Sequence, residues 1–249
     1  MTNLPSSDTS SESSTLLVEI QRSGDVLSFT LNNPGQGNQV TGTMFDAMLA
    51  ALRFEPLARV LRIRARGSVF CTGRERAGRD AEGIRAEAAR LIEFKRMIRT
   101  SSLISVAEVQ GDAFGFGMGL AIVCDFALVA NHVSLCFPEM RSGLAPAAIM
   151  GYLGEYALPR FTFPLILFGE PFTPQRALEI GLISQVCDAS SLSSEADALV
   201  ARILKLDPDA ARRCKEFFVA AQSNTFEKNC SLATEALTQG TLTALGRKK

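Results

Sequence analysis

The chain has 249 residues, of which 47% are hydrophobic, and its 26 Lys plus Arg residues balance its 26 Asp plus Glu residues. This length and apolar content are typical of a globular protein with a sizeable core. The formal net charge of zero argues against nucleic acid or an anionic membrane as the main partner. No stretch of 18 or more apolar residues without charge suggests a membrane span.

Residues 1–14 are rich in Ser and Thr, and we expect them to form a disordered tail. They have neither the basic and apolar regions of a secretory signal nor the arginines of a transit peptide. The C-terminal Leu-Gly-Arg-Lys-Lys is not a peroxisomal address of the Ser-Lys-Leu type. We therefore expect a cytoplasmic location.

The first half of the chain alternates strand and helix patterns. Short apolar runs at 16–21 and 26–31, joined by Arg22-Ser23-Gly24-Asp25, predict a hairpin. Helical spacing follows over 43–52 and a strand over 60–63. A second helix over 83–100 leads to a strand over 104–109. This alternation favours crossover connections and a parallel sheet.

The second half adds short strands at 126–130 and 133–137, and a last strand pattern ends near residue 186. Helical patterns then take over at 192–206, 208–222 and 226–245. We therefore divide the chain into an α/β core over 15–190 and a helical region over 191–249.

Metal and disulfide chemistry find little support. The single histidine, His132, falls in a turn between two apolar runs, which argues against a Ser/His/Asp triad or a histidine-rich metal site. The six cysteines are scattered and contain no Cys-x-x-Cys pair, which predicts reduced thiols and no metal ligands. They are Cys71, Cys124, Cys136, Cys187, Cys214 and Cys230.

The most informative segment is AEVQGDAFGFGMGLAIVCD at 107–125, where glycines at 111, 115, 117 and 119 lie between a strand pattern and an apolar helix. Glycine allows backbone N–H groups to approach a ligand closely, and a helix N-terminus favours negative charge. A second glycine turn, SVFCTGRE at 68–75, also follows a strand pattern. Two such turns could each direct one N–H group at the same carbonyl oxygen.

Five blocks in order, spread over residues 17–186, resemble the crotonase superfamily, the enoyl-CoA hydratase/isomerase family. The blocks are SFTLNNPGQGNQVT, VLRIRARGSVFCTGRE, AEVQGDAFGFGMGLAIVCDFALVA, VSLCFPEMRSGLAP and LFGEPFTPQRALEIGLISQV. The resemblance implies an α/β fold of spiral turns of strand, strand and helix. It also implies C-terminal helices that cover the site and pack on a neighbouring subunit in a homotrimer or a dimer of trimers. The substrate would be an acyl-CoA thioester, with coenzyme A as part of the substrate and no separate cofactor.

By this resemblance, the backbone N–H groups of Thr72 and Phe116 form an oxyanion hole. Substrate contacts would come from both turns, at Thr72, Gly73, Arg74, Glu75, Phe116 and Gly117. A lone glycine cluster would be explained equally well by close packing of helix and strand. The Arg74 side chain could meet a phosphate or only be solvated.

Proton transfer beside a thioester requires a carboxyl group whose pKa is raised by apolar surroundings. Glu139 follows an apolar strand, and it falls on the Pro-Glu motif whose glutamate is catalytic in many members of the family. Its alternative interpretation is an exposed charge or a helix cap after Pro138.

Three departures from the family pattern bear on the reaction. Hydratases of the family usually carry a second glutamate where this chain has Gly119. Glu108 could be a displaced second acid or part of a salt bridge. The segment Pro146-Ala147-Ala148-Ile149, where glycines are common in relatives, leaves the acyl-chain length open.

A single carboxylate can move a proton from one carbon to another, whereas adding water is most easily explained with two. The sequence therefore favours an isomerase that shifts the double bond of an enoyl-CoA. Two alternatives stay open. One is a hydratase or CoA lyase with a non-standard second acid, and the other is a catalytically reduced acyl-CoA-binding protein.

Overall fold

The computed structural model describes residues 16–54 and 57–246, so the predicted disordered tail lies outside the described residues. Strands β1 (Val18–Ser23) and β2 (Val26–Leu31) form the predicted antiparallel hairpin. A single turn of 3-10 helix, η1 (Pro34–Gln36), follows it.

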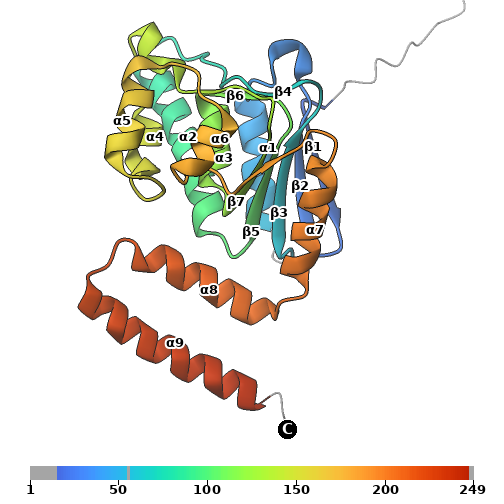
Figure 1. Ribbon diagram of the computed structural model, residues 1–249, viewed down its shortest axis with the longest axis vertical. Coiled ribbons are helices and arrows are strands. Elements are labelled where there is room, and N and C mark those ends of the chain that lie inside the picture. The colour runs from blue at the N-terminus through green and yellow to red at the C-terminus, as the bar shows by residue number, and fades with distance from the viewer. Residues whose placement is uncertain (1–15, 55–56, 247–249) are drawn as a thin grey trace, which may run out of the picture.

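The main sheet has the order β1-β2-β3-β5-β7-β9, and its strands run parallel from β2 onward. This confirms the parallel sheet expected from the alternation of patterns. Helices α1 and α3 pack on one face, with α2 against them, and α7 covers the other face (Figure 1). The bounds are β3 Val60–Ala65, β5 Ile104–Val109, β7 Phe126–Ala130, β9 Gln185–Cys187, α1 Gly42–Phe54, α2 Ala81–Thr100, α3 Phe116–Val123 and α7 Leu192–Leu204.

A second, three-stranded parallel sheet has the order β4-β6-β8, with β4 at Val69–Cys71, β6 at Asp112–Phe114 and β8 at Leu135–Cys136. The sequence patterns do not reveal β4 and β6, because three residues are too few to show alternation. Successive turns contribute one strand to each sheet and then a helix, as in β3-β4-α2 and β5-β6-α3. The predicted spiral is therefore confirmed.

Four short helices connect β8 to β9, and the sequence analysis assigned none of them. They are η2 (Pro138–Ser142), α4 (Ala147–Leu153), α5 (Pro159–Phe168) and α6 (Pro174–Glu179). Three of the four begin with proline, a residue whose fixed φ suits the first helical position. They are too short for a clear helical period, and α4 and η2 nevertheless form one wall of the cavity described below.

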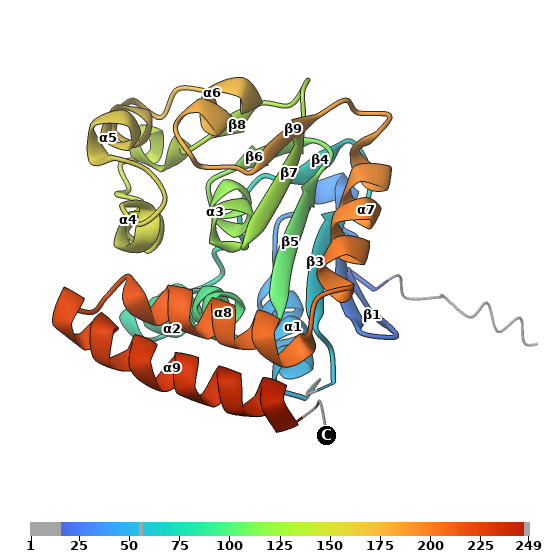
Figure 2. The ribbon, with the colours of Figure 1, turned by 60° about the horizontal axis from the view of Figure 1, so that its bottom comes forward.

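The C-terminal helices α8 (Pro208–Ala221) and α9 (Phe226–Gly246) agree with the helical region expected there. Helix α9 runs along α8 at the margin of the molecule, while α8 lies between it and α2 (Figures 1 and 2). No helix among the described residues is long and apolar enough to span a bilayer.

Lys215 fixes α8 to the core. Its side chain is buried, and Nζ donates to the carbonyl oxygens of Ile98 at 3.1 Å and Leu103 at 2.5 Å and to Oδ2 of Asp125 at 2.7 Å. Asp125 Oδ2 also accepts from the backbone N–H and the hydroxyl of Ser105. One ammonium group thus links α8 to the ends of α2, β5 and α3.

Replacing Lys215 by methionine should lower the free energy of unfolding by about 3 kcal/mol, because it removes a donor to two carbonyl oxygens and leaves the Asp125 carboxylate without its ammonium partner. Urea unfolding followed by circular dichroism measures this loss. Lys205→Met is the matched control, since Lys205 is exposed, and it should change the stability by less than about 0.5 kcal/mol. Equal stability of the two variants would show that Lys215 is not the anchor.

Candidate active site

Three consecutive strand ends of the small sheet create the site. Because β4, β6 and β8 are parallel, their carboxyl ends meet at one edge, with Cys71 paired to Ala113 and Phe114 paired to Cys136. The turn at residues 72–74 follows β4, the start of α3 follows β6, and Pro138-Glu139 follows β8. The two glycine turns and the candidate proton carrier are therefore neighbours, as the sequence analysis required.

The backbone N–H of Phe116 points outward from the first turn of α3. The carbonyl of Gly115, in the same peptide unit, accepts from Gly119 N at 3.0 Å along the helix. Since the N–H and C=O of a trans peptide point in opposite directions, the Phe116 N–H points away from the helix body. It has no acceptor within residues 16–54 and 57–246, which fits the donor predicted for Phe116.

The prediction for Thr72 does not fit the structure. The Thr72 backbone N–H donates to the carbonyl of Gly37 at 2.9 Å, and its hydroxyl donates to the same oxygen at 3.1 Å. The donor that is available lies two residues later. Gly73 O accepts from Val40 N at 3.2 Å, so the N–H of Arg74, in the same peptide unit, points away from Val40. In the part of the chain that the structure describes, this N–H has no acceptor.

Glycine is required in both turns for reasons of backbone geometry. Gly73 has φ +145°, a conformation that L-residues rarely adopt, although space is open around it. Gly115 has φ +52°, and a Cβ there would lie 2.8 Å from Oε1 of Glu139. Gly117 has a different role, because a Cβ would lie 2.1 Å from the carbonyl oxygen of Cys71. Gly117 thus permits close packing of α3 on β4.

A cavity of about 930 Å³ opens over these turns, within the size range of ligand pockets. Of the residues predicted to bind substrate, Thr72, Gly73, Arg74 and Phe116 line it, as does Glu139. Glu75 and Gly117 are not among its lining residues. The remaining wall comes mainly from α2 and the 144–149 segment, including Leu91, Ile92, Lys95, Leu144, Pro146 and Ile149.

Glu139 is the second residue of the short helix η2, and its side chain lines the cavity. Its Oε2 atom is buried and has no hydrogen-bond partner among the described residues. Burial raises the pKa of Glu139 above its ordinary value, while its own backbone N–H, the Lys95 ammonium and the Arg76 guanidinium partly offset this rise. A half-buried carboxyl group with a raised pKa and an unused oxygen is the form expected of a general base.

Lys95 is a further member of the site, and the sequence analysis missed it. It lies on α2 with its side chain 4% exposed, on the same helix face as Leu91 and Ile98. Nζ donates to the Tyr152 hydroxyl at 2.7 Å, and that hydroxyl donates to the carbonyl of Gly119 at 2.9 Å. Burial lowers the pKa of Lys95 to about 7, against an opposing attraction from Glu139. The sequence signal that could have identified Lys95 is its position on the otherwise apolar face of a predicted helix.

Lys95 and Tyr152 fill the space beside Gly119. A Cβ built on Gly119 would lie 2.5 Å from Lys95 Nζ, 2.9 Å from the Tyr152 hydroxyl and 3.1 Å from Cγ1 of Ile149. At this position, where the resemblance implies a second glutamate in hydratases, any side chain would require Lys95 and Tyr152 to shift. An ammonium group stands close to where that side chain would begin.

Glu108 takes no part in the cavity. Its Oε2 accepts from Nη2 of Arg62 at 2.6 Å and from Nε at 2.9 Å, and the pair is largely buried. Arg62 also pairs with Asp197 of α7 at 2.5 Å. Of the two interpretations left open for Glu108, the salt bridge is the correct one, and it joins the main sheet to α7.

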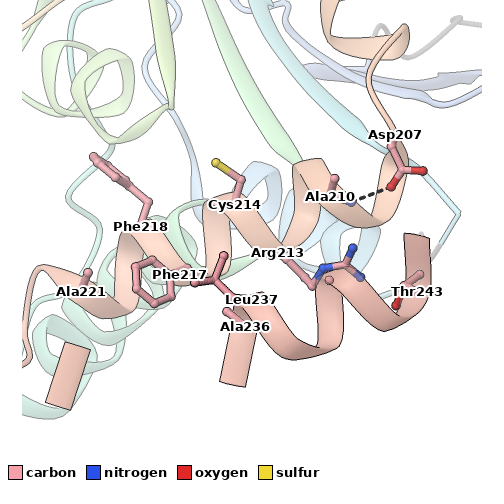
Figure 3. Close-up of a pocket in the computed structure, with 11 residues that line it drawn as sticks. Asp207, Ala210, Arg213, Cys214, Phe217, Phe218, Ala221, Ala236, Leu237 and Thr243 are labelled. Carbon is pink, nitrogen blue, oxygen red and sulfur yellow. Dashed lines mark hydrogen bonds between the residues drawn. The ribbon is translucent and has the colours of Figure 1, made fainter. Parts of the chain in front are cut away.

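A second concavity, of about 810 Å³, lies between α8 and α9 (Figure 3). It is lined mainly by apolar side chains, among them Phe217, Phe218 and Leu237. Phe218 and Leu237 are 64% and 71% exposed. The groove holds neither Glu139 nor either glycine turn, so it is not the candidate active site.

Metal and thiol chemistry receive no support from the described residues. They contain no group of three or more His, Cys, Asp or Glu side chains placed to hold a metal ion. Cys71 adjoins the β4 turn, but burial raises the pKa of its thiol to about 12, so it is inert as a nucleophile near neutral pH.

Removing the buried ammonium should stabilise the fold. Because folding lowers the Lys95 pKa to about 7, the unfolded chain holds this proton more tightly between pH 7 and about 10.4. The loss of folding stability caused by the buried Lys95 ammonium is therefore fully present below pH 7 and disappears as the pH rises toward 10. We expect Lys95→Met to gain about 3 kcal/mol at pH 6.5 and little at pH 10. Urea unfolding at both pH values tests this, with exposed Lys228→Met as control. A gain independent of pH would contradict the assignment.

The chain is similar to known proteins over most of its length. The family model for enoyl-CoA hydratase/isomerase matches residues 21–245. The enoyl-CoA isomerase/hydratase fer4 of Mycosarcoma maydis is 28% identical, over 76% of this chain and 75% of its own.

Two solved structures are also similar. An enoyl-CoA hydratase of Mycobacterium smegmatis superposes with a TM-score of 0.86 at 22% identity, covering 94% of this chain and 98% of its own. A Thermobifida fusca YX protein described as an enoyl-CoA hydratase, in complex with acetoacetyl-CoA, has a TM-score of 0.84 at 25% identity, covering 91% and 95%. With its spiral fold and the match over residues 21–245, the chain belongs to the enoyl-CoA hydratase/isomerase family.

Proposed function

We propose that this protein shifts the carbon–carbon double bond of an enoyl-CoA by way of a thioester enolate. The observation that carries the proposal is the convergence of one half-buried carboxyl group, Glu139, with two backbone donors, at Arg74 and Phe116, that have no acceptor among the described residues. Donors held in this way can stabilise an oxyanion by about 3 kcal/mol each. Family membership supports the acyl-CoA substrate class.

In the proposed reaction the thioester carbonyl oxygen accepts from the N–H groups of Arg74 and Phe116. Glu139 removes a proton from the α-carbon, and the negative charge passes to that oxygen. Glu139 then returns the proton to the γ-carbon, which moves the double bond into conjugation with the thioester. The proton count balances, because one carboxyl group takes and gives back the same proton.

The coenzyme A end of the substrate would lie toward the arginine side of the cavity. Arg74, Arg76 and Arg79 line it near the β4 turn. Guanidinium groups pair well with phosphate oxygens. Arg74 is partly engaged, since its Nη1 lies 3.3 Å from Oε2 of Glu87, so Arg76 and Arg79 are the better candidates for phosphate contacts.

Hydration is the second candidate reaction, and Lys95 is the observation that favours it. An amine with a pKa of about 7 could help to hold or activate water where other members use a carboxylate. We favour isomerisation because this chain has glycine at position 119, with Lys95 and Tyr152 in the space beside it, and therefore no second carboxylate there. A Gly119→Glu side chain would have to displace the ends of the Lys95 and Tyr152 side chains.

We also propose that copies of the chain associate, as a homotrimer or a dimer of trimers, through the helical region. Large apolar side chains on α8 and α9 remain exposed in the single chain. Apolar surface of this kind is common at subunit interfaces.

Replacing Glu139 by glutamine should abolish turnover and leave the binding of a saturated acyl-CoA within a few fold. The amide keeps the shape of the side chain but cannot accept the proton, and loss of a general base costs roughly 100-fold or more. Steady-state kinetics and a binding titration measure the two effects. Glu170→Gln, at an exposed position, is the control. If the variant retains more than about a tenth of wild-type kcat, Glu139 is not the proton carrier.

The wild-type protein should isomerise a 3-enoyl-CoA at least about tenfold faster than it hydrates a 2-enoyl-CoA of equal chain length. The reason is that one carboxyl group suffices for the first reaction. Absorbance of the conjugated thioester follows both reactions in the same assay. Faster hydration would contradict the isomerase proposal and would favour a hydratase in which Lys95 takes part.

A further inference from the structure

The cavity contains hydrogen-bond donors that its own polar side chains do not pair. Lys95 has three N–H donors, and the Tyr152 hydroxyl is the one acceptor that the described residues provide within hydrogen-bond distance. Glu139 shares the cavity wall with Lys95, but the two form no ion pair within 4 Å in the described structure. A side chain 4% exposed therefore keeps unused donors beside the substrate space.

Structural needs do not explain this lysine. Tyr152 donates to the Gly119 carbonyl whether or not a lysine is present. The rings of Phe116 and Tyr152, whose centroids lie 5.5 and 4.9 Å from Nζ, attract the ammonium group and offset part of its burial cost, but they accept no conventional hydrogen bond from its remaining N–H groups. An apolar side chain such as methionine could fill the same space without a buried charge. Burying an ammonium group with donors unused costs free energy that packing does not return.

Ligand binding would remove the water molecules that can pair with the free N–H donors of Lys95. Water can satisfy the free donors while the cavity is open, but an acyl chain that fills the cavity displaces that water. A purely hydrocarbon chain would then leave the ammonium group with the Tyr152 hydroxyl as its one acceptor, so that its other two N–H donors are unpaired. A chain with an oxygen atom at that place would supply a second acceptor, and it would be selected over its hydrocarbon analogue.

The place of that oxygen follows from the neighbours of Lys95. Nζ lies 5.5 Å from the ring centroid of Phe116, the residue whose N–H is proposed to meet the thioester oxygen. It is also close to the backbone of Gly119, one turn further along α3. The acceptor atom should therefore lie within a few bonds of the thioester and not at the far end of a long chain.

We propose that Lys95, held by Tyr152, is a specificity-determining residue that binds an oxygen substituent on the acyl group, so that the preferred substrates are oxygenated acyl-CoA thioesters. The inference rests on the proposed acyl-CoA function and names the substrate class of the same cavity. The oxygen accepts a hydrogen bond from Nζ, while Glu139 remains the proton carrier.

The test compares acetoacetyl-CoA with butyryl-CoA, two four-carbon thioesters that differ by one oxygen on the third carbon. Isothermal titration calorimetry with the full-length wild type should show at least about tenfold tighter binding of acetoacetyl-CoA. In Lys95→Met this preference should fall to about onefold, with butyryl-CoA bound as well as before or better. Retained butyryl-CoA binding shows that the variant is folded.

Arg79→Met is the matched control, because a residue at the arginine side of the cavity should weaken both ligands by the same factor and leave their ratio unchanged. An equal preference in wild type and Lys95→Met would overturn the inference, and so would a wild type that binds both ligands equally. Failure of the wild type to bind either thioester would instead contradict the proposed acyl-CoA function.

Discussion

The parallel pairing of β4, β6 and β8 is the constraint on which the site depends. Each strand has three residues or fewer, but their alignment places three chain turns at one sheet edge. The turns provide the Arg74 N–H, the Phe116 N–H and the Glu139 carboxyl group. Because two of these groups belong to the backbone, their directions are set by peptide units whose carbonyls are already bonded to Val40 and Gly119. Such donors need little reorganisation as charge develops on a ligand.

The cavity also illustrates how one missing side chain changes its surroundings. Gly119 leaves space that a long lysine from α2 and a tyrosine from α4 occupy together. The result is a carboxyl group whose pKa is raised and an amine whose pKa is lowered to about 7, on the walls of one cavity. Each group moderates the other, since the charge of Lys95 favours the ionised form of Glu139 and the reverse also holds.

Sequence patterns predicted the larger elements well, because α1, α2 and the strands of the main sheet have enough residues to show their period. Of the small sheet, the apolar run at 133–137 predicted β8, whereas β4 and β6 could be placed through the resemblance alone, since strands of three residues carry no periodicity. Glu139 and Phe116 were selected from the sequence and line the cavity, and their chemical roles stay predictions. Thr72 was wrong as a donor because a bond to Gly37, distant in sequence, uses its N–H. Lys95 was missed because the pairing that explains its burial comes from Tyr152, 57 residues away.

The central claim is that one carboxyl group carries the proton from the α-carbon to the γ-carbon. The most direct test follows deuterium in 3-butenoyl-CoA labelled at the second carbon. Glu139 lines the cavity, so a substrate bound there covers its carboxyl group, and the transferred proton should return to carbon before it exchanges with solvent. The account predicts that mass spectrometry and NMR of the crotonyl-CoA product find a substantial fraction of the deuterium on the fourth carbon. A product whose new hydrogen on that carbon comes wholly from solvent would contradict it.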